Sequence, residues 1–249
     1  MGRILDEEKP LLVAHRGASA FAFENTMASF DKAIEQGTKI VEFDVQMTRD
    51  RQLIVFHDTD IDRLTWGSGM VHHFSLKEVR KLRILGEAGI PTLEEVVSTY
   101  KDKVKFFVEI KDIPEAVDDV LELLASHGIL DDVLICSFDE EVLRKARAKS
   151  KTVTLGYLRW TVWKKHIAFA KSLDLDAIHA NDVFLTKAHV QRIHEAGLKA
   201  IAWTPTWKWW VRRALRMGVD GLVTNRVDVA RTVVETLSKQ ADEETTTQA

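Results

Sequence analysis

The sequence has little that would stabilise a chain other than a packed core. Its 249 residues include one cysteine, Cys136, which excludes an internal disulfide framework and suits a reducing compartment. No run approaches the ~18–20 consecutive apolar residues that a membrane span requires. The first ten residues are too acidic and too poor in apolar side chains for a signal peptide. We therefore predict a globular, cytoplasmic protein without a transmembrane segment.

A strong charge of one sign is also missing. The chain has 35 Lys and Arg against 38 Asp and Glu, a formal net charge of -3. This balance offers no general attraction to nucleic acid or anionic lipid, and we predict no nucleic-acid partner. The length is compatible with one α/β barrel, since such barrels often reach about 250 residues as a single unit. We predict one domain over residues 1–237, followed by a polar, disordered tail over 238–249.

Short apolar runs rich in β-branched residues recur along the chain and alternate with helical periodicity. Continuous apolar runs of this length are typical of strands buried on both faces. The runs cover residues 11–15, 40–45, 53–57, 106–110, 134–138, 154–158, 177–181, 200–204 and 221–224. Helical spacing covers 25–36, 115–126, 140–148 and 187–196. The alternation predicts either a (β/α)8 barrel or a doubly wound sheet.

The number of strand candidates favours the barrel. The runs at 40–45 and 53–57 are separated by residues 46–52 alone, which is shorter than the roughly 10–12 residues of a parallel crossover. They should therefore pair as an antiparallel hairpin with its turn near 48–52. Eight strands remain, so we predict a TIM barrel with a β-hairpin extension. Residues 59–90 are the least regular and predict a small insertion at the C-terminal face of the strands, before a helix over 91–100.

Polar side chains interrupt several predicted strands near their C-terminal ends, where barrel enzymes carry their catalytic groups. These are His15, Arg16, Glu42, Asp44, His57, Glu109 and Lys111. A single carboxylate in an apolar strand is explained by an ion pair, for example between Glu109 and Arg16. Three carboxylates at one mouth repel one another and need a cation, and oxygen ligands suit Mg²⁺ or Ca²⁺. The pattern predicts a shared site at the barrel mouth.

The motifs around these residues resemble those of the glycerophosphodiester phosphodiesterase family. In order, they are HRG at 15–17, ENT at 24–26, E-x-D-V at 42–45, T-x-D at 48–50, H-D at 57–58, R-x-T at 63–65, PTLEEV at 91–96, EIK at 109–111, SFD at 137–139, AWT at 202–204 and GVDGLVTNRVD at 218–228. The resemblance spans Leu11 to Asp228. It departs at Arg51, where the family usually has glycine, and this leaves the type of the hairpin turn open.

The resemblance implies a barrel that hydrolyses glycerophosphodiesters to sn-glycerol 3-phosphate and an alcohol with one divalent cation. The cation would be Mg²⁺ or Ca²⁺, with Mn²⁺ as a further option. The implied roles are metal binding by Glu42, Asp44 and Glu109, general acid–base catalysis by His15 and His57, phosphate binding by Arg16 and Lys111, and lining of the substrate pocket by Trp203. Which histidine is the acid, and whether water or the glycerol 2-hydroxyl attacks, stay open.

Three other readings remain. One is a phosphodiesterase for another diester, since the fold does not determine the alcohol. A second is a non-catalytic barrel that binds phosphate esters. The third, a lysophospholipase D, arises from Trp207, Trp209 and Trp210: neighbours on a helix differ by about 100°, so these rings cannot all face inward. Tryptophans flanked by cations favour a water–lipid boundary, and we predict contact with lysophospholipid or a membrane surface there.

Overall fold

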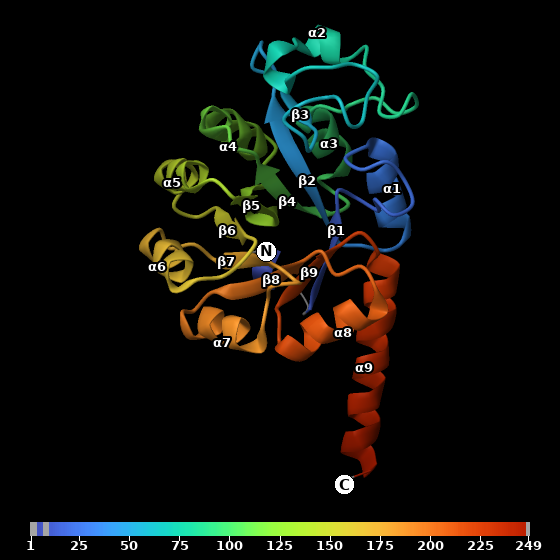
Figure 1. Ribbon diagram of the computed structural model, residues 1–249, viewed down its shortest axis with the longest axis vertical. Coiled ribbons are helices and arrows are strands. Elements are labelled where there is room, and N and C mark those ends of the chain that lie inside the picture. The colour runs from blue at the N-terminus through green and yellow to red at the C-terminus, as the bar shows by residue number, and fades with distance from the viewer. Residues whose placement is uncertain (1–3, 7–9, 248–249) are drawn as a thin grey trace.

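The computed structural model is an eight-stranded parallel barrel surrounded by helices (Figure 1). It describes the backbone of residues 4–6 and 10–247, and side chains of these residues up to 240. The barrel strands are β1 (Leu11–His15), β2 (Ile40–Met47), β4 (Lys105–Ile110), β5 (Val133–Ser137), β6 (Thr154–Arg159), β7 (Ala177–Asn181), β8 (Lys199–Trp203) and β9 (Gly221–Thr224). Because β1 pairs with both β2 and β9, the sheet closes, and the predicted TIM barrel is confirmed.

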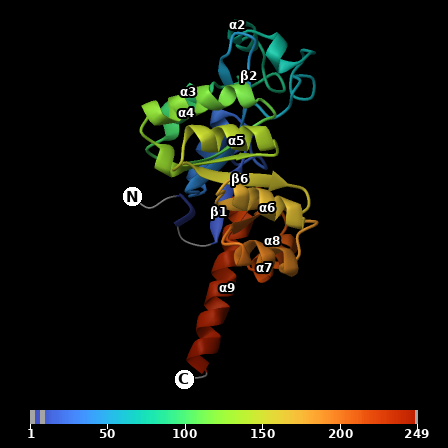
Figure 2. The same ribbon diagram turned by 90° about the vertical axis from the view of Figure 1, so that its left-hand side faces the viewer.

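Amphipathic helices cover the outside of the barrel, each following a strand in the chain (Figures 1 and 2). Apolar residues spaced for one helical face pack against the outer side chains of the strands in one large core. The helices are α1 (Met27–Glu35), α3 (Leu93–Tyr100), α4 (Val117–Ser126), α5 (Glu140–Lys149), α6 (Lys164–Ser172), α7 (Lys187–Glu195), α8 (Lys208–Met217) and α9 (Val227–Thr247). The predicted helices at 25–36, 91–100, 115–126, 140–148 and 187–196 correspond to α1, α3, α4, α5 and α7.

The predicted hairpin extends β2 beyond the barrel. Strand β3 (Leu53–Val55) pairs antiparallel with the end of β2, and the Thr48 amide donates to the Gln52 carbonyl at 2.9 Å across the turn. Arg51 has φ 57°, in the left-handed region that favours glycine. Arg51 therefore adopts at this turn a backbone conformation that glycine adopts most readily.

The insertion over 59–90 has its own small core. It contains the short helix α2 (Leu76–Val79) and a 3-10 turn at Val71–His73, and it lies to one side of the barrel (Figure 1). Its buried residues Ile61, Leu64, Val71, Val79, Ile84 and Ile90 form one cluster with Ile54 of β3 and with Phe56. These apolar positions lack a regular period, which explains why the sequence pattern indicated only a loop or insertion.

The first described turn of the chain closes the barrel interior at the N-terminal ends of the strands. Ile4 and Leu5, in a 3-10 turn at Ile4–Asp6, are buried against Leu11 and Ile40, the first residues of β1 and β2. Alternate strand residues point into the barrel. Apolar side chains fill the barrel at the N-terminal ends of the strands, and the C-terminal ends are left for polar groups. The turn thus acts as a plug that completes the core layer at the N-terminal ends of the strands.

Removing part of this plug should destabilise the protein. Ile4 is fully buried, so Ile4→Ala is expected to lower the free energy of unfolding by about 2–5 kcal/mol through lost burial and a residual cavity. Denaturant unfolding monitored by tryptophan fluorescence measures this change. Leu85→Ala, at a half-exposed site, is the control and should change the free energy little. Equal stability of the Ile4 variant and the parent chain would contradict the plug.

The last helix, α9, runs from Val227 through Thr247 and extends away from the barrel (Figure 2). It covers much of the segment for which we predicted a disordered tail, and residues 248–249 of that prediction lie outside the described part. The boundary between domain and tail near residue 237 stays a prediction. Among the described residues, no helix combines the length and apolar character needed to span a bilayer.

Candidate active site

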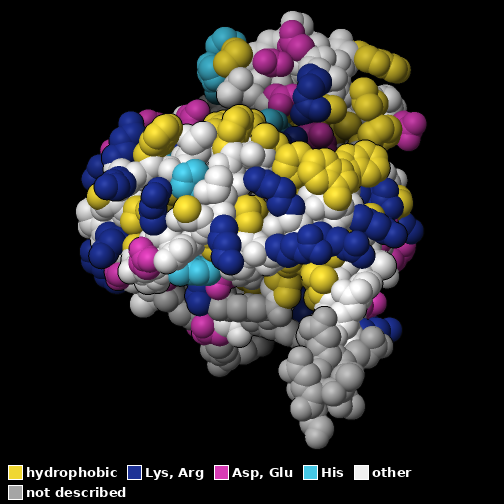
Figure 3. All heavy atoms as spheres, turned by 60° about the horizontal axis from the view of Figure 1, so that its bottom comes forward, with side chains coloured by type: hydrophobic (Ala, Val, Ile, Leu, Met, Phe, Trp, Pro, Cys, Tyr) yellow, Lys and Arg dark blue, Asp and Glu magenta, His cyan; other side chains and the backbone are white. Residues whose placement is uncertain are grey.

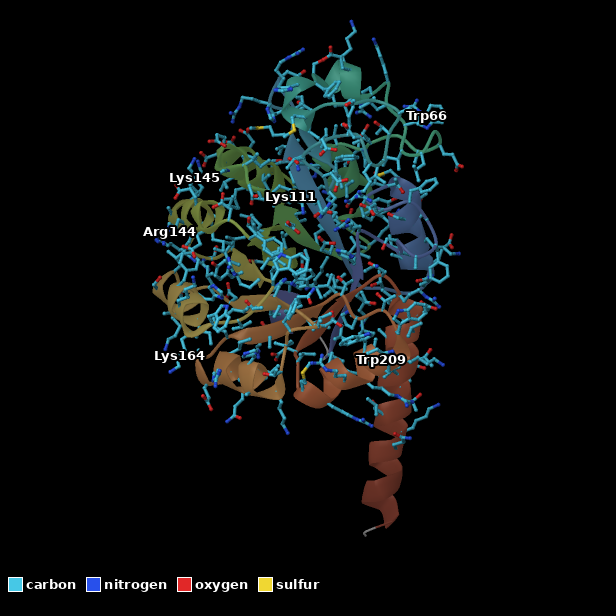
Figure 4. The ribbon with its side chains drawn as sticks, viewed as in Figure 1. Trp66, Lys111, Arg144, Lys145, Lys164 and Trp209 are labelled. Atoms are coloured by element: carbon cyan, nitrogen blue, oxygen red, sulfur yellow. The ribbon has the colours of Figure 1, made fainter. Side chains whose placement is uncertain are left out.

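The mouth at the C-terminal ends of the strands brings the predicted polar residues together. His15 pairs in register with Glu42 across β1 and β2, and Asp44 pairs with Glu109 across β2 and β4. A cavity of about 230 Å³ opens here. Its lining includes His15, Arg16, Glu42, His57, Glu109 and Trp203. Figure 4 places Lys111, just after β4, near the centre of the ring of helices. The strand ends thus gather groups that lie far apart in the sequence.

Three buried carboxylates form the centre of the site. Oxygen atoms of Glu42, Asp44 and Glu109 all lie within 4.8 Å of one another. Burial, together with repulsion from the other two carboxylates, raises the pKa of Glu42 well above its usual range. Burial also raises the pKa of Glu109 to about 7, although the ammonium of Lys111 opposes the shift. The chain alone therefore does not neutralise this cluster, and its donor set suits a hard divalent cation.

Two cationic side chains flank the carboxylates. Lys111 Nζ lies 2.6 Å from both Asp44 Oδ1 and Glu109 Oε1, and Arg16 Nε lies 3.3 Å from Asp44 Oδ2. Burial alone would raise the pKa of Asp44, but the charges of Lys111 and Arg16 hold it well below its usual range. Asp44 therefore stays ionised between the two cationic side chains.

Each histidine of the mouth is held through its Nδ1 atom. His15 Nδ1 lies 2.6 Å from Asn225 Oδ1, which also accepts from Ser19, and His57 Nδ1 lies 2.5 Å from Asp58 Oδ1. Because each partner atom is an acceptor, Nδ1 carries the hydrogen in both rings and Nε2 is left with its lone pair. Burial and the Arg16 charge lower the pKa of His15 to about 4, and burial lowers the pKa of His57. Both imidazoles are therefore neutral at pH 7.

Several residues that support the site were not predicted. Asn25, at φ 57°, donates from Nδ2 to Asp44 Oδ2 at 2.7 Å. Arg63 donates to both Glu24 and Asp58, at 2.7 and 2.6 Å, and thereby links the ENT segment to the partner of His57. The motifs contain these residues, but their partners are distant in sequence and only the fold reveals them. Asn225, which follows β9, is a further example.

Aromatic side chains form one wall of the cavity. Trp160 packs edge-on against Trp203, with ring centroids 4.8 Å apart, and stacks with Phe138 at 6.4 Å. Deeper in the cavity lie Cys136 and His179, both buried; burial and the charge of Glu109 raise the pKa of the Cys136 thiol, so it stays protonated. Trp207 and Trp209 are exposed, whereas Trp210 is half-buried and stacks on Trp209 at 4.1 Å. The mouth thus combines a charged centre with an aromatic side.

A family model of the glycerophosphoryl diester phosphodiesterase family matches residues 15–229. The chain belongs to this family. It is 32% identical over 231 residues to the glycerophosphodiester phosphodiesterase of Caldanaerobacter subterraneus subsp. tengcongensis, covering 87% of this chain and 94% of that protein. It is 29% identical over 263 residues to a glycerophosphodiester phosphodiesterase of Bacillus subtilis, covering 92% and 87% of the two chains. The predicted resemblance is confirmed, and family membership makes the protein a phosphodiesterase enzyme.

A solved structure extends the likeness to the whole barrel. A phosphodiesterase of Oleispira antarctica, determined in complex with the product sn-glycerol 3-phosphate, superposes with a TM-score of 0.86 at 27% identity. The match covers 91% of this chain and 97% of that one. The barrel and its appended elements therefore follow the architecture of that enzyme.

Proposed function

We propose that this protein hydrolyses glycerophosphodiesters to sn-glycerol 3-phosphate and an alcohol, with a divalent cation and two histidines. The observation that carries the proposal is a cavity lined by both imidazoles, Arg16 and two carboxylates. The third carboxylate, Asp44, clusters with those two, and Lys111 contacts Asp44 and Glu109. Family membership and the product found in the Oleispira antarctica enzyme support the same substrate class. We also propose that the protein works in the cytoplasm, since its one cysteine suits a reducing compartment.

Glu42, Asp44 and Glu109 would hold the cation. The fit rests on this chain's chemistry: three buried carboxylates lie close together, and burial, with repulsion from neighbouring carboxylates, raises the pKa of Glu42 and of Glu109. Oxygen donors select Mg²⁺ or Ca²⁺, and Mn²⁺ suits the same donors. When bound, such an ion would neutralise phosphate charge and stabilise the transition state as a Lewis acid.

The other residues of the mouth would bind the substrate and move protons. Arg16 lines the cavity and Lys111 lies against the carboxylates beside it, so both would orient the phosphate and stabilise the negative charge that grows on its oxygens. One histidine would accept a proton at Nε2 from the attacking hydroxyl. The other would first take up a proton from water at its own Nε2 and then deliver that proton to the departing alcohol oxygen. Trp203, on the aromatic wall, would exclude water from one side of the substrate.

Metal binding is expected to depend on pH because the carboxylates hold protons in the metal-free protein. With the pKa of Glu109 raised to about 7, falling pH protonates this ligand, so a metal ion must displace the proton. Affinity for Mg²⁺ or Mn²⁺ should therefore rise between about pH 6 and pH 8, by up to about tenfold per pH unit at the acid end. Calorimetric titration in buffers of different ionisation enthalpy measures both affinity and proton release. A pH-independent affinity without proton release would contradict this expectation.

A second candidate activity is hydrolysis of lysophospholipids, and the aromatic wall of Phe138, Trp160 and Trp203 favours it. Apolar rings beside the phosphate site would accommodate the start of an acyl chain. A metal-supplemented panel of glycerophosphocholine, lysophosphatidylcholine and bis(p-nitrophenyl) phosphate tests both candidates. We expect turnover of glycerophosphocholine, and kcat/KM for the lysolipid within about tenfold of it. A strong preference for glycerophosphocholine would reject the lysolipid activity, and turnover of the synthetic diester alone would reject both.

A further inference from the structure

The largest exposed apolar side chains gather on one part of the barrel mouth. Nine large apolar side chains are exposed among the described residues, and six of them follow three consecutive barrel strands. These six, which we term the apolar arc, are Trp160 and Trp163 after β6, Val183 and Phe184 after β7, and Trp207 and Trp209 after β8. Each is between 51 and 63% exposed. Because β6, β7 and β8 are neighbours in the sheet, their following segments form adjacent parts of the rim.

Contacts between the segments hold the arc together. Arg213 of α8 donates to the carbonyls of Asp182 and Leu185, at 2.5 and 2.7 Å, and so fixes the segment that presents Val183 and Phe184. Trp160 packs on Trp203 at the end of β8. The arc is therefore presented by segments that the fold already holds in place, which lowers the entropic cost of docking it on a partner.

The same part of the barrel carries a strong net positive charge. Residues 142–219 contain sixteen Lys and Arg against four Asp and Glu, a net of +12, whereas the remaining residues carry a net of −15 within the total of -3. Lys164, Lys165, Lys187, Lys208 and Arg212 are exposed and lie within or beside the three segments. Figure 3 turns the side with α6, α7 and α8 toward the viewer, and there dark blue side chains surround yellow patches.

The few acidic residues of this part do not interrupt the arc. Asp174 and Asp176 precede β7, and Glu195 ends α7, so all three lie toward the opposite end of the barrel. Asp182 lies in the rim but is buried. The rim from β6 to β8 therefore presents apolar side chains and positive charge together, although the chain as a whole is slightly acidic.

We infer that the apolar arc docks on an anionic lipid bilayer, with the active-site cavity facing the membrane. Exposed tryptophans enter the interface between head groups and acyl chains, and adjacent Lys and Arg attract acidic head groups. A nucleic acid would also be attracted by the charge, but a bilayer in addition accommodates the aliphatic Val183 and the other apolar side chains. The docking does not depend on the proposed function; only its use in reaching lipid-derived substrates rests on it.

Co-sedimentation with vesicles tests the docking, with activity measured separately. The full-length protein is incubated with phosphatidylglycerol vesicles and with phosphatidylcholine vesicles at low and high salt. We expect partitioning onto the anionic vesicles that exceeds partitioning onto the zwitterionic ones by at least about tenfold and that weakens with salt. Absence of binding to the anionic vesicles, or equal binding to both, would overturn the inference.

Variants locate the surface. The first variant removes one apolar side chain from each segment by the changes Trp163→Ala, Phe184→Ala and Trp209→Ala. The second variant reverses the adjacent positive charge by the changes Lys164→Glu, Lys165→Glu and Lys208→Glu. Each set should reduce partitioning by at least about tenfold while turnover of soluble glycerophosphocholine is unchanged. The control combines Trp66→Ala, Lys77→Glu and Lys81→Glu on the insertion. Trp66 is 88% exposed, and Figure 4 shows it at the upper part of the molecule, well separated from Trp209.

The control separates local docking from a general effect of charge or exposed rings. Full partitioning of the control together with loss in both arc variants supports the inference. Equal loss in the control, or retention in the arc variants, would overturn it. Displacement from vesicles by single-stranded DNA at lower concentration than by soluble anionic lipid head groups would instead assign the surface to nucleic acid. If no glycerophosphodiester is turned over but vesicle binding persists, the proposed function fails and the docking stands.

Discussion

Replacing His15 or His57 with alanine is expected to lower kcat for glycerophosphocholine by about 10²–10⁴-fold for each residue, the range of general acid–base catalysis. Each imidazole lines the cavity and is neutral at pH 7, because burial lowers its pKa. If one of the two rings is removed, one proton transfer of the reaction lacks the group that accepts or donates the proton. Steady-state kinetics at saturating substrate and metal measure the effect.

Controls must show that the loss is catalytic. His72→Ala and His73→Ala alter exposed histidines of the insertion and should leave kcat unchanged. Circular dichroism and thermal unfolding of the His15 and His57 variants should match those of the parent chain. Near-full activity in either variant would remove the role proposed for that histidine, while the role of the other would be judged independently.

Removing the divalent cation is expected to have an effect of similar size. Incubation with EDTA should abolish turnover, and Mg²⁺, Mn²⁺ or Ca²⁺ should restore it, because loss of several kcal/mol of charge stabilisation lowers the rate by about a hundredfold or more. Asp44→Asn should act in the same direction without changing the size of the side chain. Asp44 is fully buried between Lys111 and Arg16, so its loss also leaves two buried cations without their shared carboxylate.

The matched control for this variant is Asp112→Asn. Asp112 is exposed and follows Lys111 directly, so the change removes a carboxylate near the site in sequence but outside the cluster. Its activity should equal that of the parent chain. A second readout is the melting temperature, which should rise on addition of metal in the parent chain and not in Asp44→Asn. Undiminished turnover in a chelated, metal-free preparation would contradict the proposed metal dependence.

The net charge of the whole chain does not show how charge is distributed over its surface. The value of -3 indicated no general attraction to anionic lipid, yet net positive charge is concentrated in residues 142–219. Composition averages over the surface, whereas a partner meets one face. The tryptophans of 207–210 indicated a surface feature, but Trp210 is half-buried against Trp209, and the arc also includes Val183 and Phe184. These residues were not predicted, because their segments become neighbours only when the barrel closes.

The hairpin shows why local signals were sufficient for the fold. A connection of seven residues cannot cross over between parallel strands, so residues 46–52 had to form a turn, and removal of β3 left the eight strands of a barrel. The structure of the insertion could not be predicted in the same way. Its core uses apolar residues at irregular spacing, and neither a helical nor a strand period describes them.

By itself, the sequence determined the barrel and the polar residues at its mouth. Strand length, alternation and carboxylates in apolar runs are local properties, and they are sufficient to indicate both. The tertiary structure alone decided the partners: Asn225 on His15, Asp58 on His57, and Asn25 on Asp44. His15 and Asn225 are 210 positions apart, and they meet because closure of the barrel makes β1 and β9 neighbours. Sequence spacing contains no information on such a contact, whereas register across a closed sheet determines it.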